Sequence, residues 1–171
     1  MTRPSVIVLG GLSHKNEAFV QTLSEEFSKF TPTQYLAYDH WKTDGHMDFD
    51  AEIKKLVETI GRNTNFILVA KSAGILVCLK AIMEHGIVPK HCFFFGTPVT
   101  FSKTVNMSFE ELMKYPPANA VFIQNEHDPA YSASELKPIV ESKKCTLITL
   151  AGSTHEYAVQ DVLDIVKGTI K

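Results

Sequence analysis

Three side chains that together can transfer an acyl group each follow a separate short apolar run of the sequence. They are Ser72, Asp128 and His155, in that order along the chain. Acyl transfer needs a hydroxyl nucleophile, an imidazole that takes its proton, and a carboxylate that holds the imidazole in the productive tautomer. Histidine suits the middle role because its charge changes near neutral pH. These residue types predict a catalytic triad with Ser72 as nucleophile, His155 as base and Asp128 as orienting acid.

The serine lies in a segment that predicts a sharp turn from a strand into a helix. Ala70-Lys71-Ser72-Ala73-Gly74 follows a continuous apolar run and precedes a helical pattern. Small residues two positions before and after the serine let such a turn close, and the free N–H groups of the next helix favour negative charge. The alternative is that Ser72 only caps the helix. We expect the Lys71 side chain to point to solvent rather than to attract an anionic substrate.

Two carboxylates compete for the role of the acid. Asp128 is followed by a turn-favouring proline, and Glu126 lies two residues before it. We expect Asp128 to be the acid, with Glu126 as the alternative, and we expect His127 to be exposed.

The elements that must position these residues follow from the changing period of the hydrophobic pattern. Short apolar runs predict buried strands, whereas apolar residues spaced three and four apart predict amphipathic helices. The expected strands cover residues 5–9, 34–38, 66–70, 92–95, 120–124 and 145–150. The expected helices cover residues 16–30, 48–60, 73–85, a short piece near 109–114, a piece capped by Ser132 and Glu135 and distorted by Pro138, and residues 157–170.

This alternation of strands and helices defines the expected fold class. It predicts an α/β fold, a three-layer α/β/α sandwich with a mostly parallel sheet of about six strands, in a single domain over residues 1–171. In such sheets ligands bind at the carboxyl ends of the strands. The three candidate residues would therefore meet at one edge of the sheet.

Taken in sequence, these motifs resemble those of the α/β-hydrolase family over nearly the whole chain. The order nucleophile, acid, histidine is that of the family. The resemblance rests on four matches, which are Leu9-Gly10-Gly11-Leu12, Ala70-Lys71-Ser72-Ala73-Gly74, Asp128-Pro129 and Gly152-Ser153-Thr154-His155. The chain departs from the common pattern in the alanine that replaces the first glycine of the serine turn, in the lysine beside the serine, and in the lack of the frequent His-Gly pair in the first loop.

The resemblance implies an oxyanion hole made of two backbone N–H groups, those of Leu12 and Ala73. Loss of one such donor typically costs about 2.7–4 kcal/mol of transition-state stabilisation. The resemblance also implies a small member of the family that lacks the first two strands and has almost no lid. Residues 99–119 stand where larger relatives insert a cap domain. No cofactor is expected, because a triad needs none.

Three residues near the expected active edge are candidates for contact with a substrate. Gly11 belongs to a glycine pair that lets the backbone approach a ligand closely. Trp41 is the only tryptophan, and Val99 follows the fourth expected strand. Both fit the wall of an acyl pocket, and both fit an ordinary packing role as well.

Metal and disulfide chemistry are not expected. Asp39, His40 and His46 do not have a spacing that diagnoses a metal site. The three cysteines are odd in number and far apart, which matches neither a disulfide framework nor a zinc pattern. Cys92 and Cys145 lie in apolar runs, so we expect buried free thiols.

Composition and charge exclude several classes of protein. The formal net charge of −2 argues against a strongly basic nucleic-acid-binding domain. No apolar stretch approaches the roughly 18 residues that a membrane span requires, and the N-terminus lacks the pattern of a signal peptide. We therefore expect a cytoplasmic protein, and the absence of a coiled-coil pattern favours a monomer or weak homodimer.

The sequence therefore predicts a serine hydrolase that cleaves a carboxylic ester or thioester of a small-molecule acyl substrate through an acyl-enzyme. Two alternatives stay open. One is a non-catalytic α/β-hydrolase-fold binding protein that acts through protein partners. The other is a peptidase or amidase that uses the same site.

Overall fold

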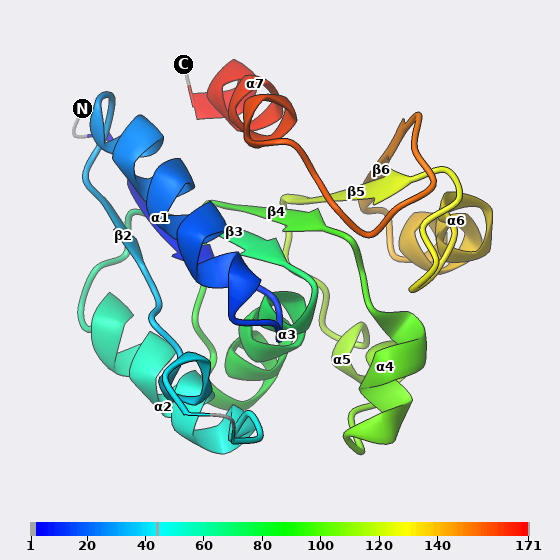
Figure 1. The fold of residues 1–171 in the computed structure, drawn as a ribbon, viewed down its shortest axis with the longest axis horizontal. Helices are drawn as coiled ribbons and strands as arrows, with labels where there is room; N and C mark the ends of the chain where they lie inside the picture. Colours follow the sequence, from blue (N-terminus) through cyan, green and yellow to red (C-terminus); the bar gives the residue numbers. More distant parts are fainter. Residues whose placement is uncertain (1–2, 44, 171) are drawn as a thin grey trace.

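The structure, a computed structural model, describes residues 3–43 and 45–170 of the chain. Its centre is a six-stranded sheet in the order β2-β1-β3-β4-β5-β6, and all neighbouring strands are parallel (Figure 1). The strands are β1 (Ser5–Leu9), β2 (Thr33–Tyr35), β3 (Phe66–Lys71), β4 (His91–Phe95), β5 (Ala120–Asn125) and β6 (Thr146–Leu150). The predicted α/β sandwich with a parallel sheet of six strands is confirmed.

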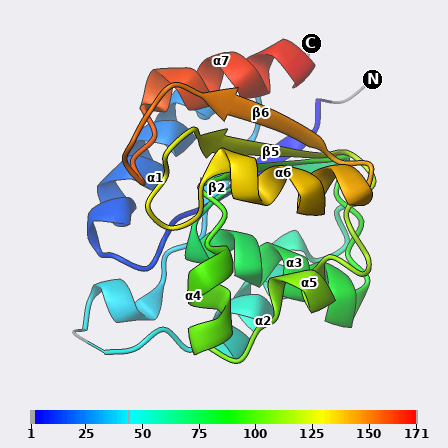
Figure 2. The same ribbon diagram turned by 90° about the vertical axis from the view of Figure 1, so that its right-hand side faces the viewer.

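Helices cover both faces of this sheet, as Figures 1 and 2 show. One face carries α1 (Lys15–Ser28) and α7 (Val159–Ile170), which contact each other. The opposite face carries α2 (Phe49–Ile60), α3 (Ala73–His85), α6 (Ala133–Ser142) and the short helices α4 (Val99–Thr104) and α5 (Phe109–Leu112). Because helices lie on both sides, the central strands are buried on both faces, which explains why they read as continuous apolar runs.

The core is centred on β3, in which every residue is buried. The neighbouring strands β1 and β4 are buried except at their first residues. At the far edge, β6 has no fully buried residue, and its positions are either half-buried or exposed. Burial of one large apolar side chain stabilises the fold by about 1.5–3 kcal/mol, so this centre anchors the strand ends that carry the site.

The order in which successive strands join the sheet reverses between β1 and β3. From β1 the chain crosses α1 to β2 at one edge, and then returns over α2 to β3 on the other side of β1. Residues Leu9 and Ala70 are register partners at the carboxyl ends of these two strands. Gly10 is the first residue after β1, and Ser72 is the first residue after β3. Open α/β sheets form a ligand-binding crevice at this point.

Several boundaries differ from those that the sequence predicts. The second strand is shorter than expected, because the chain turns into a 3₁₀ helix at Asp39–Trp41. Helix α4 was not expected. Helix α6 runs through Pro138, and its predicted capping box, between Ser132 and Glu135, is present. The expected apolar face of α1 ends early, because Phe30 lies beyond the helix and is exposed.

Candidate active site

The three predicted triad residues meet at the carboxyl edge of the sheet. The Ser72 hydroxyl lies 2.9 Å from His155 Nε2, although the two residues are 83 positions apart in sequence. On the other side of the ring, His155 Nδ1 lies 2.9 Å from both carboxylate oxygens of Asp128. Each residue follows a different strand: Ser72 follows β3, Asp128 follows β5 and His155 follows β6.

The chemistry of the partners fixes the tautomer of this histidine. An ionised carboxylate can only accept hydrogen bonds, so His155 Nδ1 carries the proton that bonds to Asp128. The lone pair of His155 Nε2 then faces the Ser72 hydroxyl, which donates to it. This arrangement can remove a proton from the serine oxygen as that oxygen attacks an electrophile.

The serine turn has the sharp geometry that its small residues predict. Ser72 has φ 52° and ψ −122°, a backbone conformation that residues with a Cβ rarely adopt. A Cβ added to Gly74 would lie 2.7 Å from the carbonyl oxygen of Gly10, and one added to Gly11 would lie 3.1 Å from Ser72 Cβ. Ser72 makes no side-chain capping hydrogen bond, so helix capping does not explain its position.

Asp128 is a buried carboxylate that is surrounded by donors. Besides His155, it accepts hydrogen bonds from the Tyr157 hydroxyl at 2.8 Å and from the Ala130 N–H at 2.8 Å. Burial alone would raise the pKa of Asp128, but the hydrogen bonds from His155, Tyr157 and Ala130 outweigh it and lower this pKa below its ordinary value. The carboxylate is therefore ionised at neutral pH.

The competing acid points away from the site. The Glu126 side chain is 61% exposed and lies 4.0 Å from His127, which is exposed as predicted. Among the described residues, the His155 side chain forms hydrogen bonds with Asp128 and Ser72 and none with Glu126. The geometry thus favours Asp128 over Glu126.

Two residues that the sequence analysis missed hold the histidine loop in place. The Asn125 side-chain amide donates to the carbonyl oxygens of Thr154 and Glu156, at 2.8 and 3.1 Å, and so brackets His155 on both sides. The backbone N–H of Asn125 donates to the Tyr157 hydroxyl at 3.0 Å. A polar residue at the end of β5 was the available signal for this role.

The backbone N–H groups of Leu12 and Ala73 belong to adjacent turns at this edge. Ala73 is the first residue of α3, where N–H groups lack partners within the helix. Leu12 follows the glycine pair after β1, the strand next to β3. Among residues 3–43 and 45–170, neither N–H donates to a protein acceptor. An oxyanion hole made of these two N–H groups stays a prediction of the sequence.

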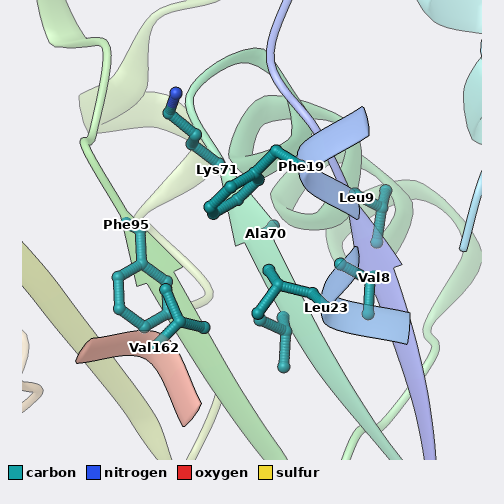
Figure 3. A pocket seen from close by; sticks show the side chains of 9 residues that line it. Val8, Leu9, Phe19, Leu23, Ala70, Lys71, Phe95 and Val162 are labelled. Atoms are coloured by element: carbon teal, nitrogen blue, oxygen red, sulfur yellow. The ribbon is translucent and has the colours of Figure 1, made fainter. Parts of the chain in front are cut away.

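The expectation that Lys71 points to solvent is wrong. Its side chain is only 6% exposed, and its ammonium group lies 2.8 Å from Glu156 and 5.3 Å from the centre of the Phe19 ring. Figure 3 shows the lysine beside this ring, at the edge of the apolar packing between α1, α7 and the sheet. The ion pair joins the residue before Ser72 to the residue after His155, so it links the two loops.

The predicted substrate-contact residues are poorly exposed. Gly11 is buried beside Ser72, Trp41 is 8% exposed, and Val99 is 1% exposed. The positions of the Trp41 and Val99 side chains therefore lend no support to a substrate-binding role. By contrast, Leu12 is 42% exposed and offers an open apolar side chain next to the glycine pair.

The remaining sequence expectations concern cysteines, metals and membranes. Cys78 and Cys92 are buried free thiols, whereas Cys145 is only partly buried, and burial raises the pKa of all three. Within the described ranges, no group of three or more His, Cys, Asp or Glu side chains could hold a metal ion. In the same part of the chain, no helix is both long and apolar enough to cross a membrane. His46 lies in a loop after the 3₁₀ turn.

The sheet order and the sharp serine turn define an α/β-hydrolase fold, and structural comparison agrees. Est1E from Butyrivibrio proteoclasticus, solved with ferulic acid, is 15% identical, with a TM-score of 0.71 over 98% of this chain and 88% of that one. XC6422 from Xanthomonas campestris, described as an α/β serine hydrolase without a lid, is 16% identical, with a TM-score of 0.69 over 99% and 80%.

A third similar structure is the esterase Est2 from Thermogutta terrifontis, solved with propionate. It is 12% identical, with a TM-score of 0.71 over 98% of this chain and 82% of that one. No protein-family model matches the sequence, and no curated protein matches it either. At these identities the likeness shows the fold, and the chain has the α/β-hydrolase fold that its sequence resemblance predicts.

Proposed function

We propose that this protein is a serine hydrolase that cleaves a carboxylic ester or thioester through an acyl-enzyme. The observation that carries the proposal is the unbroken hydrogen-bond chain from Ser72 through His155 to Asp128. This chain lies at the carboxyl edge of the sheet, beside the crevice beyond β1 and β3. The unpaired N–H groups of Leu12 and Ala73 support it, since they supply an oxyanion hole. The three similar structures described above, an esterase and a lidless serine hydrolase among them, agree with this class.

The first half-reaction forms the acyl-enzyme. As Ser72 Oγ bonds to the substrate carbonyl carbon, its proton passes to His155 Nε2 and the carbonyl π electrons move to the oxygen. The N–H groups of Leu12 and Ala73 stabilise this oxyanion, and Asp128 stabilises the imidazolium. When the oxyanion collapses, the bond to the leaving oxygen or sulfur breaks, and the leaving group takes the proton from His155.

The second half-reaction reverses these roles with water. His155 takes a proton from a water molecule as its oxygen attacks the acyl carbon. Collapse of the second oxyanion breaks the bond to Ser72 Oγ, which recovers its proton from His155. The products are a carboxylic acid and free enzyme, and no cofactor takes part.

The nature of the substrate follows from the open setting of the site. Ser72 is half-buried, and residues 99–119 form only the short helices α4 and α5, not a lid domain. Small or extended acyl substrates therefore reach the serine. Est1E and Est2 were solved with ferulic acid and propionate, which are carboxylic acids, as an ester product would be. A cytoplasmic location and a monomer or weak homodimer stay predictions from the sequence.

Labelling with a fluorophosphonate probe tests the proposal, because the probe reacts with serines that are activated as nucleophiles. We expect rapid labelling of the wild type, no labelling of Ser72→Ala, and labelling slowed at least 100-fold in His155→Ala. A panel of short p-nitrophenyl esters, thioesters and anilides then separates an esterase from a thioesterase or amidase. A folded wild type that the probe does not label would refute the proposal and favour the non-catalytic binding protein.

A further inference from the structure

The loop after β1 is held by an unusual set of hydrogen bonds. Residues 10–13 have four consecutive carbonyl oxygens that each accept a hydrogen bond from a side chain. The four bonds are Tyr38 Oη to Gly10 O at 3.1 Å, Trp41 Nε1 to Gly11 O at 3.3 Å, His40 Nε2 to Leu12 O at 2.7 Å, and Asn16 Nδ2 to Ser13 O at 2.9 Å. Loop carbonyls usually bind water or other backbone groups, whereas side chains hold all four of these carbonyls, and Ser13 O also accepts from the backbone N–H of Asn16.

Three of these four donors come from one short segment, residues 38–41. Tyr38 is fully buried, and its ring centre lies 4.5 Å from that of Trp41 and 5.6 Å from that of His40. Trp41 also packs against the loop itself, since a Cβ on Gly10 would lie 2.9 Å from the indole. Aromatic packing thus sets the directions of the donors before any ligand arrives. We call residues 38–41 the aromatic turn.

The bond from Trp41 bears directly on one peptide group. In a trans peptide the C=O and N–H bonds point in opposite directions. The peptide that carries the carbonyl of Gly11 also carries the N–H of Leu12. Because the indole N–H holds this carbonyl on the side of Trp41, the N–H of Leu12 must point away from Trp41. On another side of the same loop, Gly11 lies against Ser72.

His40 acts on the next peptide in the loop. Its Nε2 must be the donor to the Leu12 carbonyl, because a carbonyl oxygen can only accept. The carbonyls of Gly11 and Leu12 are thus both held. The peptide group that joins Gly11 to Leu12 cannot rotate without breaking the hydrogen bond from Trp41 or straining the one from His40. A rotated peptide would present a carbonyl oxygen where the oxyanion needs a donor, and would repel the negative charge.

We propose that the aromatic turn is the device that preforms the oxyanion hole, with Trp41 and His40 as positioning residues for the N–H of Leu12. This inference rests on the proposed function, and gives Trp41 a role other than the substrate contact that its position in the sequence suggested. Neither side chain touches the reacting atoms. Their loss therefore lowers transition-state stabilisation and leaves ground-state binding of the substrate nearly unchanged.

Two matched pairs of proteins test the inference by steady-state kinetics with p-nitrophenyl acetate. Trp41→Phe keeps an aromatic ring but removes the N–H, and we expect kcat to fall 10- to 100-fold with KM within about twofold of the wild type. His40 is half-exposed, so its variants are less liable to unfold. His40→Leu removes the donor and should lower kcat about 10-fold, whereas His40→Gln keeps an N–H donor and should restore much of the activity.

An inhibitor provides a readout that a merely structural role would not move. An alkyl trifluoromethyl ketone forms a tetrahedral adduct on the serine, so its affinity should fall in Trp41→Phe by the same factor as kcat. Crystals of Trp41→Phe should show the carbonyl of Gly11 in more than one orientation. Equal kcat in His40→Leu and His40→Gln, or a folded Trp41→Phe with kcat within threefold of the wild type, would overturn the inference alone. A wild type without esterase activity or probe labelling would overturn the proposed function and this inference together.

Discussion

Alanine in place of Gly96 should disable the site without removing any functional group. Gly96 follows β4 with φ 68°, and a Cβ there would lie 2.8 Å from His155 Cε1 and 2.8 Å from Tyr157 Cε2. Ordinary carbon contacts are about 3.5–4.0 Å, so the His155 ring must withdraw by about 0.7–1.2 Å. The hydrogen bond between Ser72 and His155 is 2.9 Å long, and a shift of that size takes it out of range.

The magnitude of the effect follows from this displacement. A misplacement of about 1 Å costs about 100-fold in rate, which corresponds to about 2.7 kcal/mol of activation free energy. The positive φ adds a cost of about 1–2 kcal/mol to folding for a residue with a Cβ. In a chain of 171 residues that cost lowers Tm by about 2–8 °C. We therefore expect Gly96→Ala to be folded at 25 °C and to have kcat/KM about 100-fold below the wild type.

The chain offers a matched control in Gly86, which ends α3. Gly86 has φ 63°, and nothing lies within 4 Å of the Cβ that alanine would add. Gly86→Ala therefore has a similar backbone cost but no collision, and should lose stability while keeping full activity. Hydrolysis of p-nitrophenyl acetate and thermal unfolding, measured on both variants, separate the two effects. If kcat/KM of Gly96→Ala lay within threefold of Gly86→Ala, the contact between Gly96 and His155 would not govern activity.

Three further predictions concern the carboxylate, its partner and the cysteines. Because the pKa of Asp128 is lowered from 3.8 in the folded state, its contribution to stability is fully present above about pH 4 and is lost as pH falls through the folded value. Urea unfolding between pH 2 and 6 should therefore show a steeper acid-side loss in the wild type than in Asp128→Asn, and parallel curves would contradict this. Tyr157→Phe leaves the buried N–H of Asn125 unpaired, which should lower the free energy of unfolding by about 1–3 kcal/mol, as denaturant melts can measure. Ellman's reagent should titrate at most one thiol, Cys145, rapidly in the folded protein and all three in denaturant, and fast reaction of more than one native thiol would show that the core opens.

Much of the fold could be read from local patterns. The spacing of apolar residues encodes which face of each element is buried, so the alternation of strands and helices was predictable with boundaries within a few residues. The exceptions are the segments whose conformation depends on distant partners. The second strand was expected at residues 34–38, but β2 ends at Tyr35, and after Leu36, whose N–H still bonds to Val8, the chain leaves the sheet. Tyr38 and Trp41 then hydrogen-bond to the loop after β1.

The candidate site divides in the same way. The sequence by itself determined the residue types Ser72, Asp128 and His155 and their order, because each marks the end of an apolar strand and only certain side chains can do this chemistry. The sequence favoured Asp128 and left Glu126 as an alternative, and only the tertiary structure brings Asp128 to the histidine. Alternate residues of an extended segment point in different directions only as long as the strand lasts, and both carboxylates lie in the turn beyond β5.

The supporting residues were beyond the reach of the sequence because their partners are far away along the chain. Lys71 is buried against Glu156, 85 residues later, and Asn125 brackets the histidine loop from about 30 residues before it. Trp41 reaches a carbonyl 30 residues earlier. Such contacts depend on which strand ends become neighbours in the sheet. Local periodicity reports burial and direction, whereas the strand order that brings these partners together is a property of the whole folded chain.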